Sequence, residues 1–566
     1  MLSSVLTSTK FLIRFKKALS RPTSCLARSA VIGLTAVLIA LAQRPPGWTT
    51  FSGDPQRTGW AKSETELKKE NIQNLKLQWR LKLDNAAKEL NGLTVPLVTR
   101  NLITSKGFKE LLLVAGASDK VFAVDSDTGK VFWQKTMEIE GAPKQKMSHW
   151  LCPNALNATP VIGPAPGGQS TNPFRGPQAV YVLSSDGKLH AFNLVNGEDL
   201  LPPTPFVPPF GKTWSLNLVD GVLYTTTSQG CNGVKSGVYA MDLNDAGHKV
   251  SYFQAGLAGA GIWGRAGAAI TPSGKVLVET GDGPYDLEKG NLSDTVIALS
   301  SKDLKLADYY TPANRAWITR KDLDMGNMTP VVFPFKDREL VAAAGKEGVI
   351  YLLDTKSLGG SDHRTPLFRS PLYSNEEVNF AARGFWGALS TWQDSSETRW
   401  LYAPAWGPPA TDGKFPIQYG ATPNGSIMAF KVDVQDGKPI LVPAWNSRDM
   451  SVPEPVVVAN GLIFALSDGD FPQQANENGG ILSSQDRAAK AGNAVLYVLD
   501  ATTGKELFSS GDTIHGFTHF SAPVVSDGPG IRCDARQHCL RFRPGTVAIS
   551  KNGWTTAASS ENREFE

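Results

Sequence analysis

The chain has 566 residues, of which 41% are hydrophobic and only 19% charged, so it can bury a large core and is not a disordered protein. Its 57 basic and 53 acidic residues give a net charge of +4, but six of the basic residues lie in the first 42 positions. The rest of the chain therefore carries 51 basic against 53 acidic residues, a net charge of −2. This balance gives no basic face, so a nucleic-acid partner is not expected.

The first 42 residues have the composition of a secretory signal peptide. They contain no acidic residue, and an apolar run from Ser29 to Ala42 ends in the cleavage pattern Ala40-Leu41-Ala42. We therefore expect residues 1–42 to be removed and the protein to be periplasmic or extracellular. The alternative is that the leader is kept as a membrane anchor, for which the apolar run is short. Residues 43–74 form a lead-in segment.

One short strand phrase recurs along the chain and is often followed by a glycine turn. The clearest copies are FAVD (122–125) before DTG (127–129), and LYVLD (496–500) before TGK (503–505). Five further copies lie between them: HAFN (190–193), YAMD (239–242), IALS (297–300), YLLD (351–354) and MAFK (428–431). Repetition of one supersecondary unit predicts a single repeated architecture and not a series of unrelated domains.

A second phrase, a proline followed by apolar and mostly β-branched residues, precedes most of these copies. Proline as the first residue of a strand removes no ladder hydrogen bond, so each phrase indicates an entry into a sheet. Two further strands surround each alanine-containing strand, which makes four strands per unit and predicts β-propeller blades. Five proline phrases and three less regular openings give eight blade starts: 95–98, 159–162, 213–215, 265–268, 329–332, 384–387, 454–457 and 522–525.

The sequence therefore predicts an all-β, eight-bladed β-propeller of four-stranded antiparallel blades over residues 75–550. The last start, near residue 522, has little chain after it, whereas LQWRL (77–81) is a strand without a proline phrase. We expect this N-terminal strand to complete the last blade and close the ring, which also removes an exposed sheet edge. Residues 551–566 are expected to be a disordered tail.

Four cysteines remain after removal of the leader. Cys533 and Cys539 bracket a short polar loop, which favours a local disulfide in an oxidising compartment. The pairing of Cys152 and Cys231 is left open.

The region from Gly261 to Leu299, with its Gly281-Asp282-Gly283 motif, resembles the cofactor-facing region of pyrroloquinoline-quinone (PQQ) alcohol dehydrogenases. Residues 345–354 (GKEGVIYLLD) resemble another segment of the same family, and the similarity extends over most of residues 50–550. In that family PQQ lies on the ring axis against a Trp, with a calcium ion at its quinone oxygens and an Asp as base.

The resemblance implies roles for particular residues of this chain. Trp263 would lie under the cofactor, Lys346 would contact the quinone, and Asp282 would be a calcium ligand. An indole face stacks on a flat ring system, a cation stabilises charge on a reduced quinone, and carboxylates suit calcium. Arg265 and Trp386, in similar openings, are further candidates for cofactor binding.

The chain also departs from the family pattern. It has Gly230-Cys231-Asn232 where the family has a Glu ligand, and Lys289-Gly290-Asn291 where the family has the catalytic Asp. Asp282 and Asp294 are the candidates for a substitute base. No C-x-x-C-H haem motif is present, so an electron acceptor would be external.

Two functions follow from these observations. The first is an exported quinoprotein-like propeller that binds PQQ or a related planar ligand on its axis, as a dehydrogenase for an alcohol or sugar. The alternative is a non-catalytic scaffold that binds protein partners, similar to the propellers of outer-membrane assembly. The departures favour the second function, and Trp263 with the Gly-Asp-Gly motif favours the first.

Overall fold

A computed structural model describes residues 47–100, 102–145, 149–167, 178–256, 260–526, 530–533 and 538–544, with side chains omitted at 530–533. The expected signal peptide, its anchor alternative and the expected tail at 551–566 all lie outside these residues. No helix in the described part of the chain is both long enough and apolar enough to cross a membrane.

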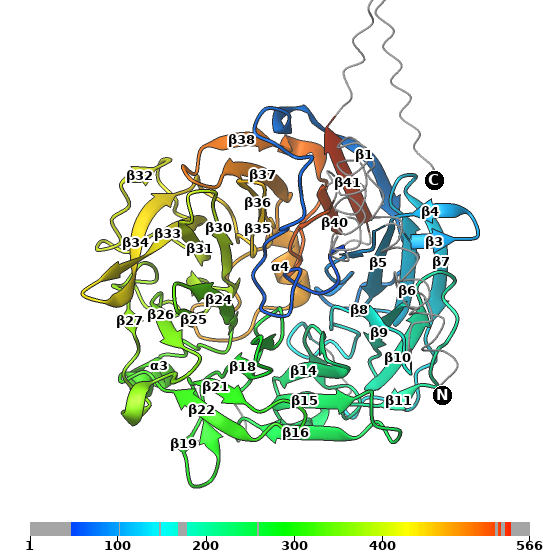
Figure 1. Cartoon of the computed structure of the whole chain (residues 1–566), viewed down its shortest axis with the longest axis horizontal. Helices are drawn as coiled ribbons and strands as arrows, with labels where there is room; N and C mark the ends of the chain where they lie inside the picture. The colour runs from blue at the N-terminus through cyan, green and yellow to red at the C-terminus, as the bar shows by residue number, and fades with distance from the viewer. Residues whose placement is uncertain are drawn as a thin grey trace, which may run out of the picture. The chain divides into compact units, whose positions relative to one another are not determined.

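The described residues form antiparallel sheets arranged around a common centre (Figure 1). Seven sheets of four or more strands are each built from one continuous stretch of chain. The first four are β2 (Leu97–Val98), β5 (Leu111–Gly116), β6 (Lys120–Asp125) and β7 (Lys130–Thr136); β8 (Val161–Pro164), β9 (Gln178–Leu183), β10 (Lys188–Asn193) and β11 (Thr204–Pro205); β12 (Lys212–Thr213), β13 (Asn217–Val219), β14 (Val222–Ser228), β15 (Gly237–Asp242) and β16 (Val250–Gln254); and β17 (Ala269–Ile270), β18 (Val276–Glu279), β21 (Val296–Leu299) and β22 (Leu306–Tyr310).

The remaining three continuous sheets follow in chain order. They are β24 (Val331–Phe335), β25 (Arg338–Ala344), β26 (Ile350–Asp354) and β27 (Phe368–Arg369); β28 (Gly384–Phe385), β30 (Ser390–Gln393), β31 (Arg399–Trp406), β32 (Ile417–Gln418), β33 (Gly425–Gln435) and β34 (Lys438–Asn446); and β35 (Val457–Ala459), β36 (Leu462–Ser467), β37 (Val495–Asp500) and β38 (Glu506–Ser509).

One further four-stranded sheet combines the two ends of the described chain. Its strand order is β1 (Leu75–Lys82), β41 (His538–Pro544), β40 (Gly530–Cys533) and β39 (Val524–Val525). Leu77 pairs with Phe542 and Leu81 with Cys539, so the pairing expected for the N-terminal strand is present. The all-β propeller is confirmed. Its seven continuous blades are one fewer than the eight expected, because the chain after residue 522 forms only part of a blade.

Short elements decorate the sheets. Two hairpins, β3–β4 and β19–β20, and a parallel pair, β23–β29, lie outside the main sheets. The bounds are β3 (Leu102–Thr104), β4 (Gly107–Lys109), β19 (Tyr285–Asp286), β20 (Asn291–Leu292), β23 (Met328–Thr329), β29 (Gly387–Ala388), α3 (Arg315–Arg320) and α4 (Ser484–Lys490), with 3₁₀ turns at Ile72–Asn74, Cys231–Gly233, Gly360–Asp362 and Gly511–Thr513.

The repeated Asp–Gly turn has a packing role that explains its recurrence. Oδ1 of Asp500 accepts hydrogen bonds from the backbone N–H groups of Thr502 and Thr503, which fixes the turn. Gly504 then has φ +74°, and a Cβ there would lie 2.6 Å from the Trp445 ring. The Trp445 indole N–H donates to Ala501 O at 3.1 Å. A tryptophan of one sheet thus rests on the glycine turn of the next, and Trp79 and Trp133 do the same at Gly129 and Gly197.

The hydrophobic core lies between neighbouring blades. Strands β5 and β6 present Leu113 and Val121 to Val180 and Val182 of β9, and all four side chains are fully buried. The inner strands are buried on both faces, so they read as continuous apolar runs such as LLLVAG at 111–116.

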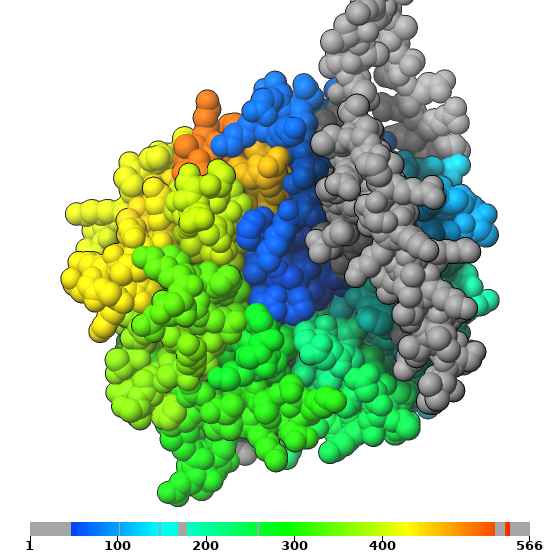
Figure 2. All heavy atoms as spheres, viewed as in Figure 1, coloured from blue at the N-terminus to red at the C-terminus, as the bar shows by residue number. Residues whose placement is uncertain are grey.

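Residues 48–61, here called the strap, run across the centre of the ring. Backbone hydrogen bonds connect the strap to β2, β8, β17, β24, β30 and β35, that is, to six of the seven continuous sheets. The fully buried Arg57 anchors it further, donating to Ala268 O and Phe51 O at 3.1 and 2.8 Å. Figure 2 shows this first described part of the chain, in blue, filling the middle of one face. The strap therefore covers the central axis on this face.

Candidate functional site

One cavity of the described structure has a volume of about 710 Å³, within the range of small-molecule sites. Its walls come from loops and strands of several blades, and no strap residue lines it. Aromatic and charged side chains dominate the lining: Trp150, Lys212, Trp214, Trp263, Asp282, Asp322, Asp324, Lys346, Trp386 and Phe520.

Trp263 provides a flat surface in this cavity. Its indole ring lies against Gly261 and Gly281, where an added Cβ would approach ring atoms to 2.6 and 2.5 Å. Only glycine leaves room for the ring at these two positions. The Trp263 backbone N–H donates to Gly326 O at 2.9 Å, which fixes the residue from behind. The side chain is half-buried, and its accessible part belongs to the cavity.

Lys346 lies beside this surface and is held by two aspartates. Its Nζ is 2.5 Å from Asp324 Oδ2 and 3.0 Å from Asp322 Oδ1. The same nitrogen is 5.9 Å from the Trp263 ring centroid and 5.3 Å from that of Trp386. The backbone N–H of Lys346 donates to Asp324 O, so the two loops are joined. Lys346 is therefore a fixed cation at the edge of the aromatic surface.

Three carboxylates converge at this point. Oxygens of Asp282, Asp322 and Asp324 all lie within 4.8 Å of one another. Asp324 Oδ1 accepts the backbone N–H of Asp282 at 2.8 Å. Three acids face one ammonium group, so the wall has an excess of acidic groups. This arrangement can bind a cation through carboxylate oxygens.

The pKa values of the three acids diverge. Burial, and then the charge of Asp324, raises the pKa of Asp282 to about 8. Burial raises the pKa of Asp322 to about 7, although Lys346 opposes this. Burial would also raise the pKa of Asp324, but Lys346 beside it lowers the value overall. At neutral pH the cluster therefore keeps Asp324 ionised and holds protons on its neighbours, as expected when like charges are crowded.

Four of the residues singled out in the sequence meet in this cavity: Trp263, Asp282, Lys346 and Trp386. Trp386 stacks on Trp406 at 4.4 Å between ring centroids. Asp294 does not line the cavity. It lies behind Gly281, whose carbonyl accepts the Asp294 backbone N–H at 2.9 Å, and its carboxylate accepts the Thr319 hydroxyl. Burial, and then the charge of Asp324, raises the pKa of Asp294 to about 7.

Arg265 also lies outside the cavity lining. It is buried, forms an ion pair with the fully buried Glu454, and its guanidinium carbon lies 3.9 Å from the Phe520 ring centroid. A second group of buried charges continues from there. Asp470 Oδ2 lies 2.6 Å from Arg487 Nη2 and 2.7 Å from His519 Nδ1. We call Arg265, Glu454, Asp468, Asp470, Arg487 and His519 the sealed cluster.

Asp322 and Asp324 are functional candidates that the sequence patterns did not reveal. They occur in Asp322-Leu323-Asp324, a pattern that in isolation is typical of an exposed loop. The alternation around the buried Leu323 is the one signal that could have identified them, because residues two apart in an extended segment share a face. Lys212 and Trp150, on another wall of the cavity, were missed as well.

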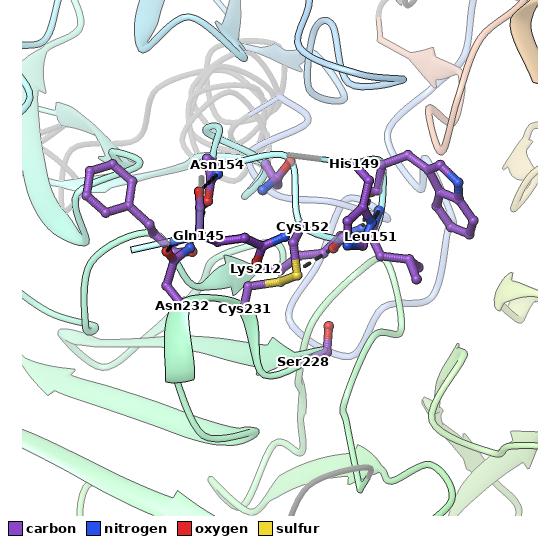
Figure 3. The surroundings of a disulfide bond; sticks show 12 residues. Gln145, His149, Leu151, Cys152, Asn154, Lys212, Ser228, Cys231 and Asn232 are labelled. Carbon is purple, nitrogen blue, oxygen red and sulfur yellow. Dashed lines mark hydrogen bonds between the residues drawn. A yellow bond between two sulfur atoms is a disulfide. The ribbon is translucent and has the colours of Figure 1, made fainter. Parts of the chain in front are cut away.

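A disulfide joins two segments that contribute to the cavity wall (Figure 3). Cys152 and Cys231 are 79 residues apart in sequence, and their Cα atoms are 5.5 Å apart. Their neighbours Leu151 and Gly230 line the cavity. Asn232 reinforces the link by donating to Asn154 Oδ1 at 2.7 Å. The pairing left open by the sequence is therefore Cys152 with Cys231.

Cys533 and Cys539 lie directly opposite each other in the β40–β41 ladder. The Cys533 side chain is outside the described side chains, so the expected bond between these two stays a prediction.

Comparison with known proteins gives a consistent family signal. Residues 48–232 match the family described as glucose/ethanol/alcohol dehydrogenase, beta-propeller domain, a family of PQQ enzymes. The resemblance to the quinoprotein propellers is confirmed.

Solved structures of quinoprotein propellers share the fold. Quinohemoprotein alcohol dehydrogenase from Comamonas testosteroni superposes with a TM-score of 0.56 at 14% identity, covering 92% of this chain and 84% of that one. The quinohemoprotein alcohol dehydrogenase ADHIIG from Pseudomonas putida HK5 gives 0.54 at 14% identity, with 92% and 84% covered. A europium-containing methanol dehydrogenase gives 0.55 at 15% identity, with 86% and 89% covered. No curated protein sequence matches the chain significantly.

Proposed function

We propose that this protein binds PQQ or a closely related planar quinone in the axial cavity and oxidises an alcohol or sugar there. The observation that carries the proposal is the joint placement of Trp263, Lys346 and three aspartates in one cavity of about 710 Å³. A flat ligand resting on the indole would place its edge near the ammonium and the carboxylates. The quinoprotein relatives support the class of ligand.

The aspartates fit a cation that accompanies the quinone. Their oxygens are hard ligands, and burial, together with the charge of Asp324, raises the pKa of Asp282 to about 8 and of Asp322 to about 7. A divalent or trivalent cation would remove this repulsion, because it favours the ionised form of each ligand. Calcium is the cation expected from the sequence, and one similar structure contains europium.

Asp322 is the side chain best placed to accept a proton from a substrate hydroxyl. Its side chain is 47% exposed, whereas that of Asp324, the other acid bound to Lys346, is 1% exposed.

A bound quinone would supply the two-electron acceptor for the alcohol. The chain's own residues would orient it: Trp263 sets the plane, and Lys346 stabilises negative charge on the reduced ring oxygens. The quinone would take up the C–H hydrogen with its two electrons, the carboxylate of Asp322 would accept the hydroxyl proton, and the product would be a carbonyl compound. An external acceptor must then reoxidise the cofactor.

Two finer features belong to the same proposal. We take the composite sheet of β1, β41, β40 and β39 as an eighth blade, because its four strands match the other blades in order and pairing.

We also take the protein to be exported, which the leader-like sequence and the disulfide support.

The scaffold alternative makes a different prediction for the cavity. A protein that only holds partners on its blade faces has no need for three acids and a lysine beside the half-buried indole of Trp263. Such crowding costs stability unless a ligand uses it.

The proposal is tested by measuring the binding of PQQ through the quenching of tryptophan fluorescence, with calcium in excess. We expect wild type to bind in the micromolar range or tighter and to show dye-linked oxidation of a primary alcohol. Trp263→Ala should lose affinity by about tenfold to 100-fold, because it removes the stacking surface. Trp317→Ala, a half-buried tryptophan on α3 outside the cavity lining, is the matched control and should bind normally. Wild type that neither quenches nor turns over would refute the proposal.

A further inference from the structure

Lys212 is a buried cation on another wall of the same cavity, in β12. Its exposed fraction is 4%, yet it contributes to the lining. Its Nζ donates to Trp150 O at 3.0 Å and lies 5.2 Å from the Trp214 ring centroid. Among the described residues, no carboxylate lies within ion-pair distance of it, in contrast to Lys346 with its two aspartates. An ammonium group can donate three hydrogen bonds, so Lys212 has donors to spare.

The surroundings of Lys212 make the lack of a nearby carboxylate, among the described residues, energetically unfavourable. Arg487, whose guanidinium carbon lies 4.7 Å from the Trp150 ring centroid, adds a second positive charge nearby. The one acid paired with Arg487 is Asp470, which also binds His519. Burial, and then Arg487, lowers the pKa of Lys212 to about 7. A buried ammonium without a counterion is unfavourable, and an anion from outside would correct this.

The position of Lys212 is fixed, as a binding group requires. Trp150, which accepts its hydrogen bond, donates its own indole N–H to Leu482 O at 2.8 Å. Two residues further on, Cys152 is joined to Cys231 by the disulfide. Figure 3 shows Lys212 beside this disulfide. The donor is therefore pre-organised, so little side-chain entropy is lost when it binds an anion.

We propose that Lys212 binds a carboxylate of the planar ligand, so that the ligand has its anionic end at β12 and its quinone edge at Lys346 and the aspartates. This assignment rests on the proposed function. It adds which end of the ligand lies at β12, and which class of quinone the cavity prefers. Planar quinones without a carboxylate would leave Lys212 uncompensated. The cavity therefore selects acidic quinones such as PQQ over neutral ones of similar size.

The test compares PQQ with its trimethyl ester, both with excess calcium, by quenching or calorimetry. Wild type should bind PQQ about tenfold to 100-fold more tightly than the ester, since a charge-assisted hydrogen bond of this kind is at stake. Lys212→Met should bind PQQ about tenfold to 100-fold more weakly than wild type does. It should bind the ester with the affinity of wild type. Comparing the ratio of affinities between proteins cancels the extra size of the ester groups. Lys212→Met that discriminates as wild type does would overturn the assignment.

Two controls separate a role of Lys212 in binding from a role in folding. Lys275 is also partly buried and donates to a backbone oxygen, Thr355 O at 2.6 Å, but it does not line the cavity. Lys275→Met should leave both affinities unchanged. Without ligand, Lys212→Met should melt at the same temperature as wild type or higher, because an uncompensated charge is removed. A lower melting temperature would show a structural role and overturn the assignment. Wild type that binds neither PQQ nor the ester would instead refute the proposed function, and this assignment with it.

Discussion

Two groups of buried charges near the axis differ in whether their charges are matched. In the sealed cluster, Arg265 pairs with Glu454, and Arg487 pairs with Asp470. In the cavity wall, three aspartates face the single ammonium of Lys346, and Lys212 has no acid beside it. The first group pairs each arginine with an acid, whereas the second has three acidic groups for one ammonium at one wall and an ammonium without an acid at another. Burial of charge alone therefore does not set the proposed site apart, but titratable groups without matching partners that face a cavity do.

The largest expected effect comes from unbalancing the sealed cluster. Arg265→Met leaves Glu454 buried and unpaired next to the fully buried Asp468. We expect a loss of about 3–5 kcal/mol in the free energy of unfolding, measured by denaturant titration. The double variant Arg265→Met/Glu454→Met should recover most of that loss, since it restores the balance. If the double variant is as unstable as the single one, the ion pair is not what stabilises this region.

A smaller effect is expected from the cavity wall. Asp324→Asn removes the ionised acid beside Lys346 and should cost about 2 kcal/mol of stability, the range for a hydrogen bond to a charged group. It should also abolish the rise in melting temperature that calcium gives to wild type. Asp286→Asn, on the exposed side of the β19–β20 hairpin and paired with Lys289, is the control and should keep the calcium response. A calcium response that survives in Asp324→Asn would remove this wall as the cation site.

The smallest effect is a pH dependence of stability that comes from the acids of the cavity wall. The pKa of Asp282 is raised to about 8 and that of Asp322 to about 7, from 3.8 when unfolded. Between about pH 4 and 8 the folded state therefore binds protons that the unfolded state has released, so stability falls as pH rises through this window. Urea unfolding from pH 5 to 8 should show a shallower slope in Asp282→Asn than in wild type. Equal slopes would mean that these acids titrate normally.

The sequence predicted the parts of the site that local patterns encode. Trp263 was recognisable by resemblance, and the structure shows its ring resting on Gly261 and Gly281. Asp282 and Lys346 were recognisable by resemblance. Asp322 and Asp324 were not, because only folding brings their loop against Lys346.

Arg265, in contrast, was a candidate from the sequence that does not line the cavity. It lies two residues from Trp263 and would share its face in a strand, but residues 260–268 are not a strand. Its side chain instead turns to Glu454 and Phe520. The fold was easier to predict from the sequence than the candidate site, because the turn aspartates and glycines of the blades are local signals. The pairing of the two chain ends was predicted as well, but the start near residue 522 was counted as a full blade, whereas the chain after it forms only part of one.

The strap has a consequence for how the ring is assembled. Its residues leave the ribosome before any blade does, yet Gly59 has its backbone partner at Val458, about 400 residues later in the chain. Contacts of such long sequence separation slow folding, because a large loop must close before they form. The centre of the propeller therefore cannot be completed during synthesis of the early blades. We expect removal of residues 48–61 to leave blades that pair locally but a ring that fails to fold cooperatively.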